Sequence, residues 1–359
     1  YTSVISGYAD STYRHAPSDN AGAATASWIP TIPQAGTYAV WAWYLHGSNR
    51  SGDAAYQIHH AGGTTEVRIS QKVHGQTWRC LGEYYFEAGT AGRVTLTSQS
   101  NSAGQVVVAD AMRFGGGSGT IVAPGGTSGE PRWEEAAKPW IEYQRAPLWL
   151  YEENDSAARP LYAEWETAKG HPSEAGNAVY VSWHTNAGGG TGTNTYIHST
   201  KTPAGSPELQ DWVHSELVSD IQVAWNPAWI DRGQKSADFA ELRGLSTIPG
   251  VLLEVAFHDT EDPGDADDLR EPVFRQIAAR AVYQGIAKYF AQRDLTYPHL
   301  LPEPPARVVA RYRGSDQVTV EWQAPPCCDG VRGDAATSYK LYRSKDGRSF
   351  DNGTQTANT

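Results

Sequence analysis

The fold and the chemistry of this chain are constrained most by two apolar runs of strand length, each with one chemically active side chain. Residues 179–187 read VYVSWHTNA and residues 251–257 read VLLEVAF, so His184 and Glu254 each follow an apolar stretch. Open α/β sheets place their chemistry at the carboxyl edge of such strands, which predicts that both side chains reach one rim. Imidazole is a common zinc ligand and a carboxylate can accept a proton from water, so the pair indicates metal-assisted hydrolysis.

One imidazole is too few for a catalytic zinc site, which usually uses three protein ligands. Taken alone, His184 is equally compatible with a strand-end histidine that bonds to the backbone. Glu254 is harder to explain structurally, since a carboxylate between Leu253 and Val255 is costly to bury without a partner or a task. We therefore expect a functional Glu254, with a structural salt bridge as the alternative.

Length and charge limit the classes of protein. The chain has 359 residues, enough for two or three domains. Its 40 Asp and Glu against 29 Lys and Arg disfavour a nucleic-acid partner, and the lack of a long apolar run predicts no membrane span. Thirteen Trp and nineteen Tyr suit aromatic platforms for carbohydrate as well as protein cores. Three cysteines give no disulfide framework, and the adjacent Cys327 and Cys328 are not expected to pair.

Residues 1–117 have the pattern of an all-β sandwich. Short strand-like runs separated by turn residues occur at residues 36–44, 54–60, 65–71, 78–86 and 92–97. Several motifs there resemble the golvesin-type β-sandwich module of secreted bacterial hydrolases and xanthan lyase-like proteins: ATASWIP (24–30), GTY (36–38), GSNR (47–50), GQTW (75–78) and ADAMRFG (109–115). The resemblance implies carbohydrate binding. We also expect the module's opening strand to be missing, as in a chain that starts inside a longer precursor.

Residues 118–298 alternate between helix-like and strand-like patterns. A glycine-rich stretch precedes a helix start at Pro131, and residues 148–151 predict a strand. Helices are expected at residues 159–166, 207–221 and 271–290. Strands that alternate with helices predict an α/β sheet with parallel pairs.

Motifs of this region resemble the zinc-dependent N-acetylmuramoyl-L-alanine amidases of peptidoglycan remodelling: SWHTNA (182–187), GTNTY (192–196), DRG (231–233) and LEVAF (253–257). The resemblance implies that His184 is a zinc ligand and Glu254 the catalytic glutamate. It also suggests that Asn186 and Arg232 orient the site or the substrate, although structural roles fit both equally well.

The resemblance further implies ligands without a counterpart here. The family's first zinc histidine and its glutamate ligand are expected upstream of Tyr1, with the sandwich inserted into the amidase fold. As substitutes, Glu130, Glu134 and Glu135 fit an exposed helix start better. The histidine candidates within the region are His171, His198 and His258, although histidines usually have local structural explanations.

Residues 299–359 open with a proline-rich linker around PEPP (302–305). Strand-like runs follow at residues 307–312, 317–322 and 338–344. They resemble about the first half of a fibronectin type III module, for which we expect a spacer role.

Together these patterns predict a multidomain protein: an all-β sandwich, an incomplete amidase-like α/β sheet and a partial fibronectin type III β-sandwich. The expected function is a secreted or cell-envelope peptidoglycan amidase that uses zinc and carries a glycan-binding insert. Its expected partners are peptidoglycan or another glycan and the upstream fragment of the same precursor. The alternative is a non-catalytic extracellular glycan-binding or assembly protein. A polysaccharide lyase would need a tyrosine or lysine site, which the sequence does not reveal.

Overall fold

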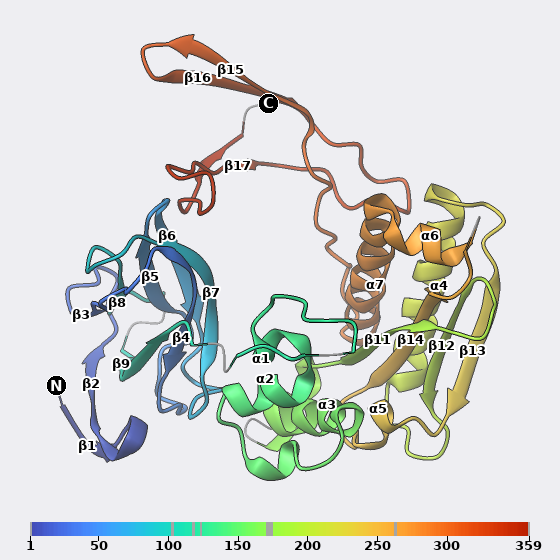
Figure 1. Ribbon diagram of the computed structural model, residues 1–359, viewed down its shortest axis with the longest axis horizontal. Coiled ribbons are helices and arrows are strands. Elements are labelled where there is room, and N and C mark those ends of the chain that lie inside the picture. The colour runs from blue at the N-terminus through green and yellow to red at the C-terminus, as the bar shows by residue number, and fades with distance from the viewer. Residues whose placement is uncertain are drawn as a thin grey trace. The chain divides into compact units, whose positions relative to one another are not determined.

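The computed structural model describes residues 2–101, 104–116, 119–122, 124–169, 175–261 and 264–357. The chain forms two compact units (Figure 1). The first unit runs to Ala158 and includes Lys340–Thr356, and the second comprises Arg159–Tyr339 and the last residues from Ala357. Within the described ranges, none of the helices combines the length and apolar character needed to cross a bilayer. The multidomain organisation expected from the sequence is confirmed, with a β-rich region first.

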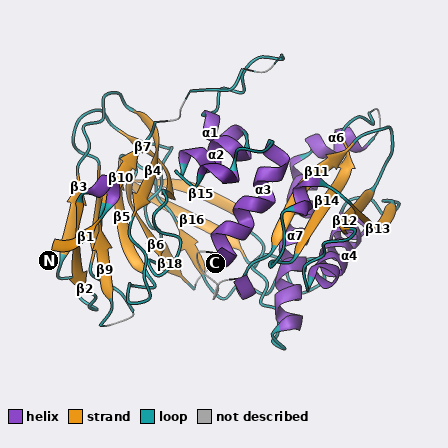
Figure 2. Ribbon diagram, turned by 90° about the horizontal axis from the view of Figure 1, so that it is seen from below, coloured by secondary structure: helices purple, strands orange, loops and turns teal. Residues whose placement is uncertain are grey.

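Strands dominate the first unit, as the orange arrows of Figure 2 show. One sheet has the order β1 (Thr2–Ser6), β2 (Thr12–Pro17) and β9 (Val106–Ala109), and another has β10 (Ala111–Phe114), β4 (Gly36–Trp43) and β7 (Arg79–Phe86). The largest has β3 (Thr25–Trp28), β8 (Arg93–Thr97), β5 (Ala54–His60) and β6 (Gly63–Ile69). A 3₁₀ turn, η1 (Tyr8–Asp10), joins β1 to β2. All pairings between these strands are antiparallel.

Side chains from two of these sheets meet in one core. Tyr56 and Ile58 of β5 alternate toward that core with period two, as a strand with one buried face requires. Val40 of β4 and Leu96 of β8 reach it from either side. Strand β4 is buried on both faces, because Trp41 packs in the opposite direction. This double burial accounts for the continuous apolar run of β4.

Two short helices, α1 (Arg132–Glu135) and α2 (Ala137–Tyr143), follow the glycine-rich stretch. Ala136 between them has an extended backbone, so the helix that was expected to start at Pro131 is divided into two short pieces. The prediction of a strand at residues 148–151 is wrong. Residues Leu148–Leu150 form a 3₁₀ turn, η2, that starts after Pro147 and buries Leu150. Periodicity cannot separate a buried strand from a buried turn in so short an apolar run.

The second unit is built on a mixed sheet of order β11, β14, β12, β13 (Figure 1). Its strands are β11 (Tyr180–Asn186), β12 (Thr193–His198), β13 (Asp231–Ala237) and β14 (Gly250–Phe257). Its helices are α3 (Asp155–Glu164), which starts in the first unit, α4 (Ser206–Ala224), α5 (Ala240–Arg243), α6 (Asp265–Arg270) and α7 (Pro272–Arg293), with short turns η3 (Trp165–Lys169) and η4 (Ala175–Asn177). The expected parallel pairs are confirmed for β11 with β14 and for β12 with β13, whereas β12 and β14 are antiparallel.

The two faces of this sheet are covered differently. Val251, Leu253 and Val255 of β14 pack with α4 and α7 in the largest core. Leu252 points the other way, into a smaller cluster with Leu242 of α5. Because neighbouring residues on a strand face opposite sides, Glu254 belongs to the face of Leu252. The side chain of Glu254 therefore faces away from the large core.

Gly285 lets α4 and α7 approach closely. A Cβ atom at Gly285 would lie 2.8 Å from Cα of Val213 and 3.0 Å from the carbonyl oxygen of Trp212. An alanine normally stabilises a helix interior by about 1 kcal/mol relative to glycine. Here we expect Gly285→Ala to lower the free energy of unfolding by about 1–3 kcal/mol, because backbone atoms must shift. Thermal unfolding checks this, with the exposed Gln276→Ala as control. A Gly285→Ala variant as stable as the native protein would contradict it.

The segment after α7 packs back onto that helix within the second unit. Oε2 of Glu303 lies 2.7 Å from Nη1 of Arg280, and the side-chain amide of Gln284 donates to the carbonyl of Val331 at 3.0 Å. The proline-rich linker is therefore docked on α7 through Glu303. Beyond it, β15 (Ala306–Gly314) pairs with β16 (Gln317–Gln323), and β17 (Tyr339–Leu341) with β18 (Thr354–Thr356). These separate two-stranded sheets do not show a fibronectin type III module.

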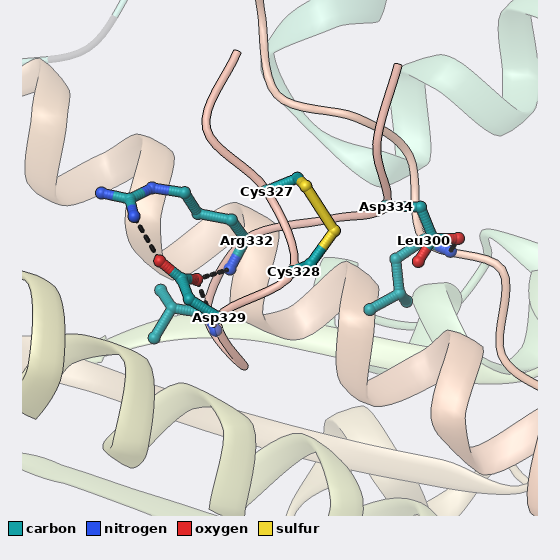
Figure 3. The surroundings of a disulfide bond; sticks show 7 residues. Leu300, Cys327, Cys328, Asp329, Arg332 and Asp334 are labelled. Carbon is teal, nitrogen blue, oxygen red and sulfur yellow. Dashed lines mark hydrogen bonds and ion pairs between the residues drawn. A yellow bond between two sulfur atoms is a disulfide. The ribbon is translucent and has the colours of Figure 1, made fainter. Parts of the chain in front are cut away.

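Cys327 and Cys328 form a disulfide with each other, contrary to expectation (Figure 3). Cys328 has a left-handed backbone with φ of 66°, which changes the course of the chain between the two residues. The turn that follows is held by Asp329, whose carboxylate accepts from the backbone N–H of Arg332 at 2.9 Å. Asp334 then bonds to the backbone of Leu300, closing the loop against the docked linker.

Candidate active site

The sheet of the second unit brings His184 and Glu254 side by side. His184 on β11 is the register partner of Glu254 on β14, and Asn194 on β12 is the partner of Glu254 on its other side. Directly paired residues share a face of a sheet, so these three side chains form one row across three strands. The expectation that His184 and Glu254 meet is confirmed. Glu254, however, lies within β14, because Val255 and Phe257 continue the buried strand beyond it.

Glu254 is a partly buried carboxyl group with an unfilled hydrogen-bonding position. Its Oε2 is buried and has no partner among the described residues. Burial raises the pKa of Glu254, the nearby Glu241 raises it further, and His258 offsets part of the effect. A carboxyl group with a raised pKa exchanges its proton closer to neutral pH, as a general base that later acts as an acid must do.

His184 is held on the same face by its neighbour two residues back. Oγ of Ser182, which is 4% exposed, lies 3.0 Å from Nε2 of His184. Burial lowers the pKa of His184; Glu241 opposes that change and Arg159 adds to it. The neutral imidazole is thus favoured, and this is the form that binds metal ions.

Asn186 and Arg232 contact different parts of this region. The Nδ2 of Asn186 lies 3.5 Å from Oδ1 of Asn194, at the row of site residues. Arg232 donates to the carbonyl of Thr191 at 3.4 Å, and its guanidinium lies 4.9 Å from the ring centroid of Phe257. Arg232 therefore braces the loop before β12 against the end of β14. Arg232 lies near the start of β13.

Two family profiles match the chain in the regions just described. The profile for N-acetylmuramoyl-L-alanine amidase matches residues 144–288, and the profile for the Golvesin C-terminal domain matches residues 1–116. The chain contains an amidase domain and a golvesin domain. Both resemblances noted from sequence motifs are thereby confirmed at the level of the domain.

Relatives match either domain over limited lengths. The sporulation-specific N-acetylmuramoyl-L-alanine amidase of Bacillus subtilis (strain 168) is 36% identical over 115 residues, 32% of this chain and 41% of that protein. Xanthan lyase of Bacillus sp. (strain GL1) is 37% identical over 99 residues, 27% of this chain and 11% of that protein. A solved structure of N-acetylmuramoyl-L-alanine amidase from Clostridium difficile 630 is 25% identical with a TM-score of 0.29, covering 38% of this chain and 82% of that one. The chain spans less than half the length of these two curated relatives.

The other histidine candidates of the amidase domain have local partners. His198 lies at the end of β12, where Nε2 is 2.9 Å from Oδ1 of Asp238 and Nδ1 accepts from the backbone N–H of Lys201 at 2.9 Å. Nδ1 of His258 lies 3.0 Å from Oγ1 of Thr185. His171 lies outside the described residues. Both ring nitrogens of His198 are occupied, which gives it a structural role.

The alternative acidic ligands lie in the first unit. Glu134 and Glu135 are in α1, and Glu130 precedes that helix. The pKa of Glu134 is raised to about 6, by burial first and then by Glu83 and Glu130. Their surroundings are those of an acidic helix start, as the sequence suggested.

The residues present match only part of a zinc site. Within the described ranges, no three His, Cys, Asp or Glu side chains gather closely enough to hold a metal ion. The neutral imidazole of His184 is a suitable donor. The amidase domain as described thus supplies one fitting ligand, and a complete site needs others.

Sequence reasoning missed three residues of this region. Asn194 is fully buried and its Nδ2 lacks a partner among the described residues, next to the similarly unpartnered Glu254. Ser182 contacts His184, and Glu241 affects both site residues electrostatically. An asparagine inside an apolar strand is a signal that could have drawn attention to Asn194. Glu241 carried no such signal, because it reaches the site through the packing of α5.

Proposed function

We propose that the intact protein cleaves the amide bond between N-acetylmuramic acid and L-alanine in peptidoglycan. The observation that supports this most is the buried, unpartnered carboxylate of Glu254 beside His184 within an amidase domain. In this proposal Glu254 removes a proton from the attacking water. It then delivers that proton to the departing amine, so its carboxyl group returns to its starting state.

His184 serves in this proposal as one of the zinc ligands. Zinc, when bound, supplies Lewis-acid activation of the amide carbonyl. The remaining ligands come from a segment outside these 359 residues, as the amidase motifs imply. Asn186, which contacts Asn194, and Arg232, which braces the neighbouring loop, keep the row of site residues in position.

The other regions hold the enzyme at its substrate. In this proposal the golvesin domain, at residues 1–117, binds glycan, and residues 118–298 carry the amidase chemistry. A location outside the cell or in the cell envelope follows from a peptidoglycan substrate.

A non-catalytic glycan-binding role for the chain alone is the second candidate. It is favoured by one observation: the described residues bring one imidazole, and no group of three metal ligands, to the site. The two proposals differ in what the chain can do without the rest of its precursor.

The test compares this chain alone with the same chain joined to its upstream segment. Zinc content is measured, together with the release of L-alanine amino termini from purified peptidoglycan. We expect stoichiometric zinc and cleavage only when the upstream segment is present. Stoichiometric zinc in the lone chain would contradict the incomplete site. Zinc binding without any cleavage by the longer protein would favour the non-catalytic role.

A further inference from the structure

A second candidate site lies in the first unit, where the golvesin domain meets α1 and α2. It is a pocket of about 430 Å³ lined by Arg113, Arg132, Pro139, Glu142, Tyr143 and Arg145. Arg113 is on β10, and the other lining residues lie in or next to the two helices. All six residues belong to one compact unit, so the pocket does not depend on how the two units are placed.

Arg113 is held in place by aromatic rings. Its guanidinium carbon lies 3.7 Å from the ring centroid of Tyr143, 4.7 Å from Trp78 and 5.0 Å from Trp41. One nitrogen, Nη1, donates to the carbonyl of Tyr143 at 3.0 Å. Nε and Nη2 are buried without a hydrogen-bond partner among the described residues. Arginine normally uses its donors in a planar fork, so two idle donors on a fixed guanidinium are costly.

The charges around the pocket are unbalanced. Three guanidinium groups line it against one carboxylate, that of Glu142, and no ion pair between described residues involves Arg113, Arg132 or Arg145. This is unusual in a chain with a net charge of −11. Burial lowers the pKa of Arg113, and Arg145 nearby also contributes to the lowering.

Arg145 also has an energetically unfavourable backbone conformation. Its backbone φ of 59° is in the left-handed region that side chains other than glycine rarely adopt. The guanidinium carbon of Arg145 lies 5.1 Å from the ring centroid of Tyr8. Strained residues of this kind often mark a ligand site.

We propose that this pocket binds a carboxylate or phosphate group carried by an acidic saccharide. The planar guanidinium fork matches both oxyanions, and the anion would neutralise the excess positive charge. Tyr143 is 9% exposed and stacks on both Arg113 and Trp133, so its ring fixes the Arg113 guanidinium at the pocket wall. This inference is independent of the proposed amide cleavage, because no residue of the second unit takes part.

The test is calorimetric titration of the full chain at low ionic strength with trigalacturonate, with inorganic phosphate and with neutral chitotriose. We expect trigalacturonate, phosphate or both to bind at one site, with chitotriose much weaker. The double variant Arg132→Gln, Arg145→Gln should weaken anion binding about tenfold or more, because it removes two charge-assisted donors from the pocket. Arg93→Gln is the matched control, because Arg93 is an exposed arginine of the same unit outside the pocket.

The outcomes separate the possibilities. Loss of trigalacturonate binding alone in the double variant assigns the site to carboxylates, and loss of phosphate binding alone assigns it to phosphates. No anion binding by the native chain overturns the proposal, as does equal weakening by Arg93→Gln, which indicates unspecific attraction. If the double variant unfolds, Arg132→Gln alone, at an exposed residue, provides the same comparison.

Discussion

Under the proposed mechanism, replacing Glu254 by glutamine is expected to lower the rate of amide cleavage about 10²–10⁴-fold in the intact protein supplied with zinc. Glutamine has nearly the same shape but cannot accept the proton from water or return it to the leaving amine. The measurement is the release of L-alanine amino termini, with zinc content followed in parallel. We expect zinc to remain bound, because the proposal gives Glu254 no role as a ligand.

Glu208→Gln is the control for this comparison. Glu208 is an exposed residue of α4, on the helix that covers the opposite face of the sheet. Its replacement should leave the rate unchanged. If Glu254→Gln keeps the native rate, the assignment of the proton-transferring group is wrong. If it loses zinc together with activity, Glu254 is instead a metal ligand.

The second large effect concerns stability and involves Asp220 of α4. This carboxyl group is 1% exposed, and its Oδ2 lacks a partner among the described residues. Its pKa is raised from 3.8 to about 7, by burial first and then by Glu216, with Arg280 and Lys288 in opposition. The folded protein therefore holds this proton more tightly than the unfolded chain. Stability that is present below pH 3.8 is lost progressively as the pH rises to about 7.

Asp220→Asn is expected to remove this loss. The native protein and the variant should have similar free energies of unfolding near pH 4. Above pH 7 the free energy of unfolding of the variant should be higher by roughly 4 kcal/mol. Hydrogen exchange of the α4 and α7 amides measures this difference in the free energy of unfolding within the second unit, to which both helices belong. The exposed Asp211→Asn on the same helix is the control. A constant difference between pH 4 and pH 8 would mean that Asp220 titrates normally.

Local patterns were sufficient to predict much of the fold. The helix expected at residues 271–290 became α7, because its apolar positions form one buried face. The short strand-like runs became β4 to β8, although β4 is buried on both faces. The prediction of a strand at residues 148–151 was wrong, because the burial of these residues depends on contacts elsewhere in the chain. The expectation that Cys327 and Cys328 do not pair was wrong, because nothing in the sequence showed the left-handed backbone that Cys328 adopts.

The candidate site was predictable where it depended on strands that run in parallel. His184 and Glu254 meet because two apolar runs pair with their carboxyl ends at the same edge. Asn194 joins them through an antiparallel pairing, which the expected parallel topology did not include. Glu241 depends on the docking of a four-residue helix, and such contacts arise only from the tertiary fold.

The docked linker determines where the chain can be shortened. A protein trimmed at residue 298 would lose Glu303 and Val331, so Arg280 and Gln284 on α7 would be left without those partners. Removing the partner of a poorly hydrated charge costs more than the pair itself contributes. The residues after α7 are in this sense a part of the amidase fold's own scaffold, and a shortened version suited to biochemistry should retain the chain through Asp334.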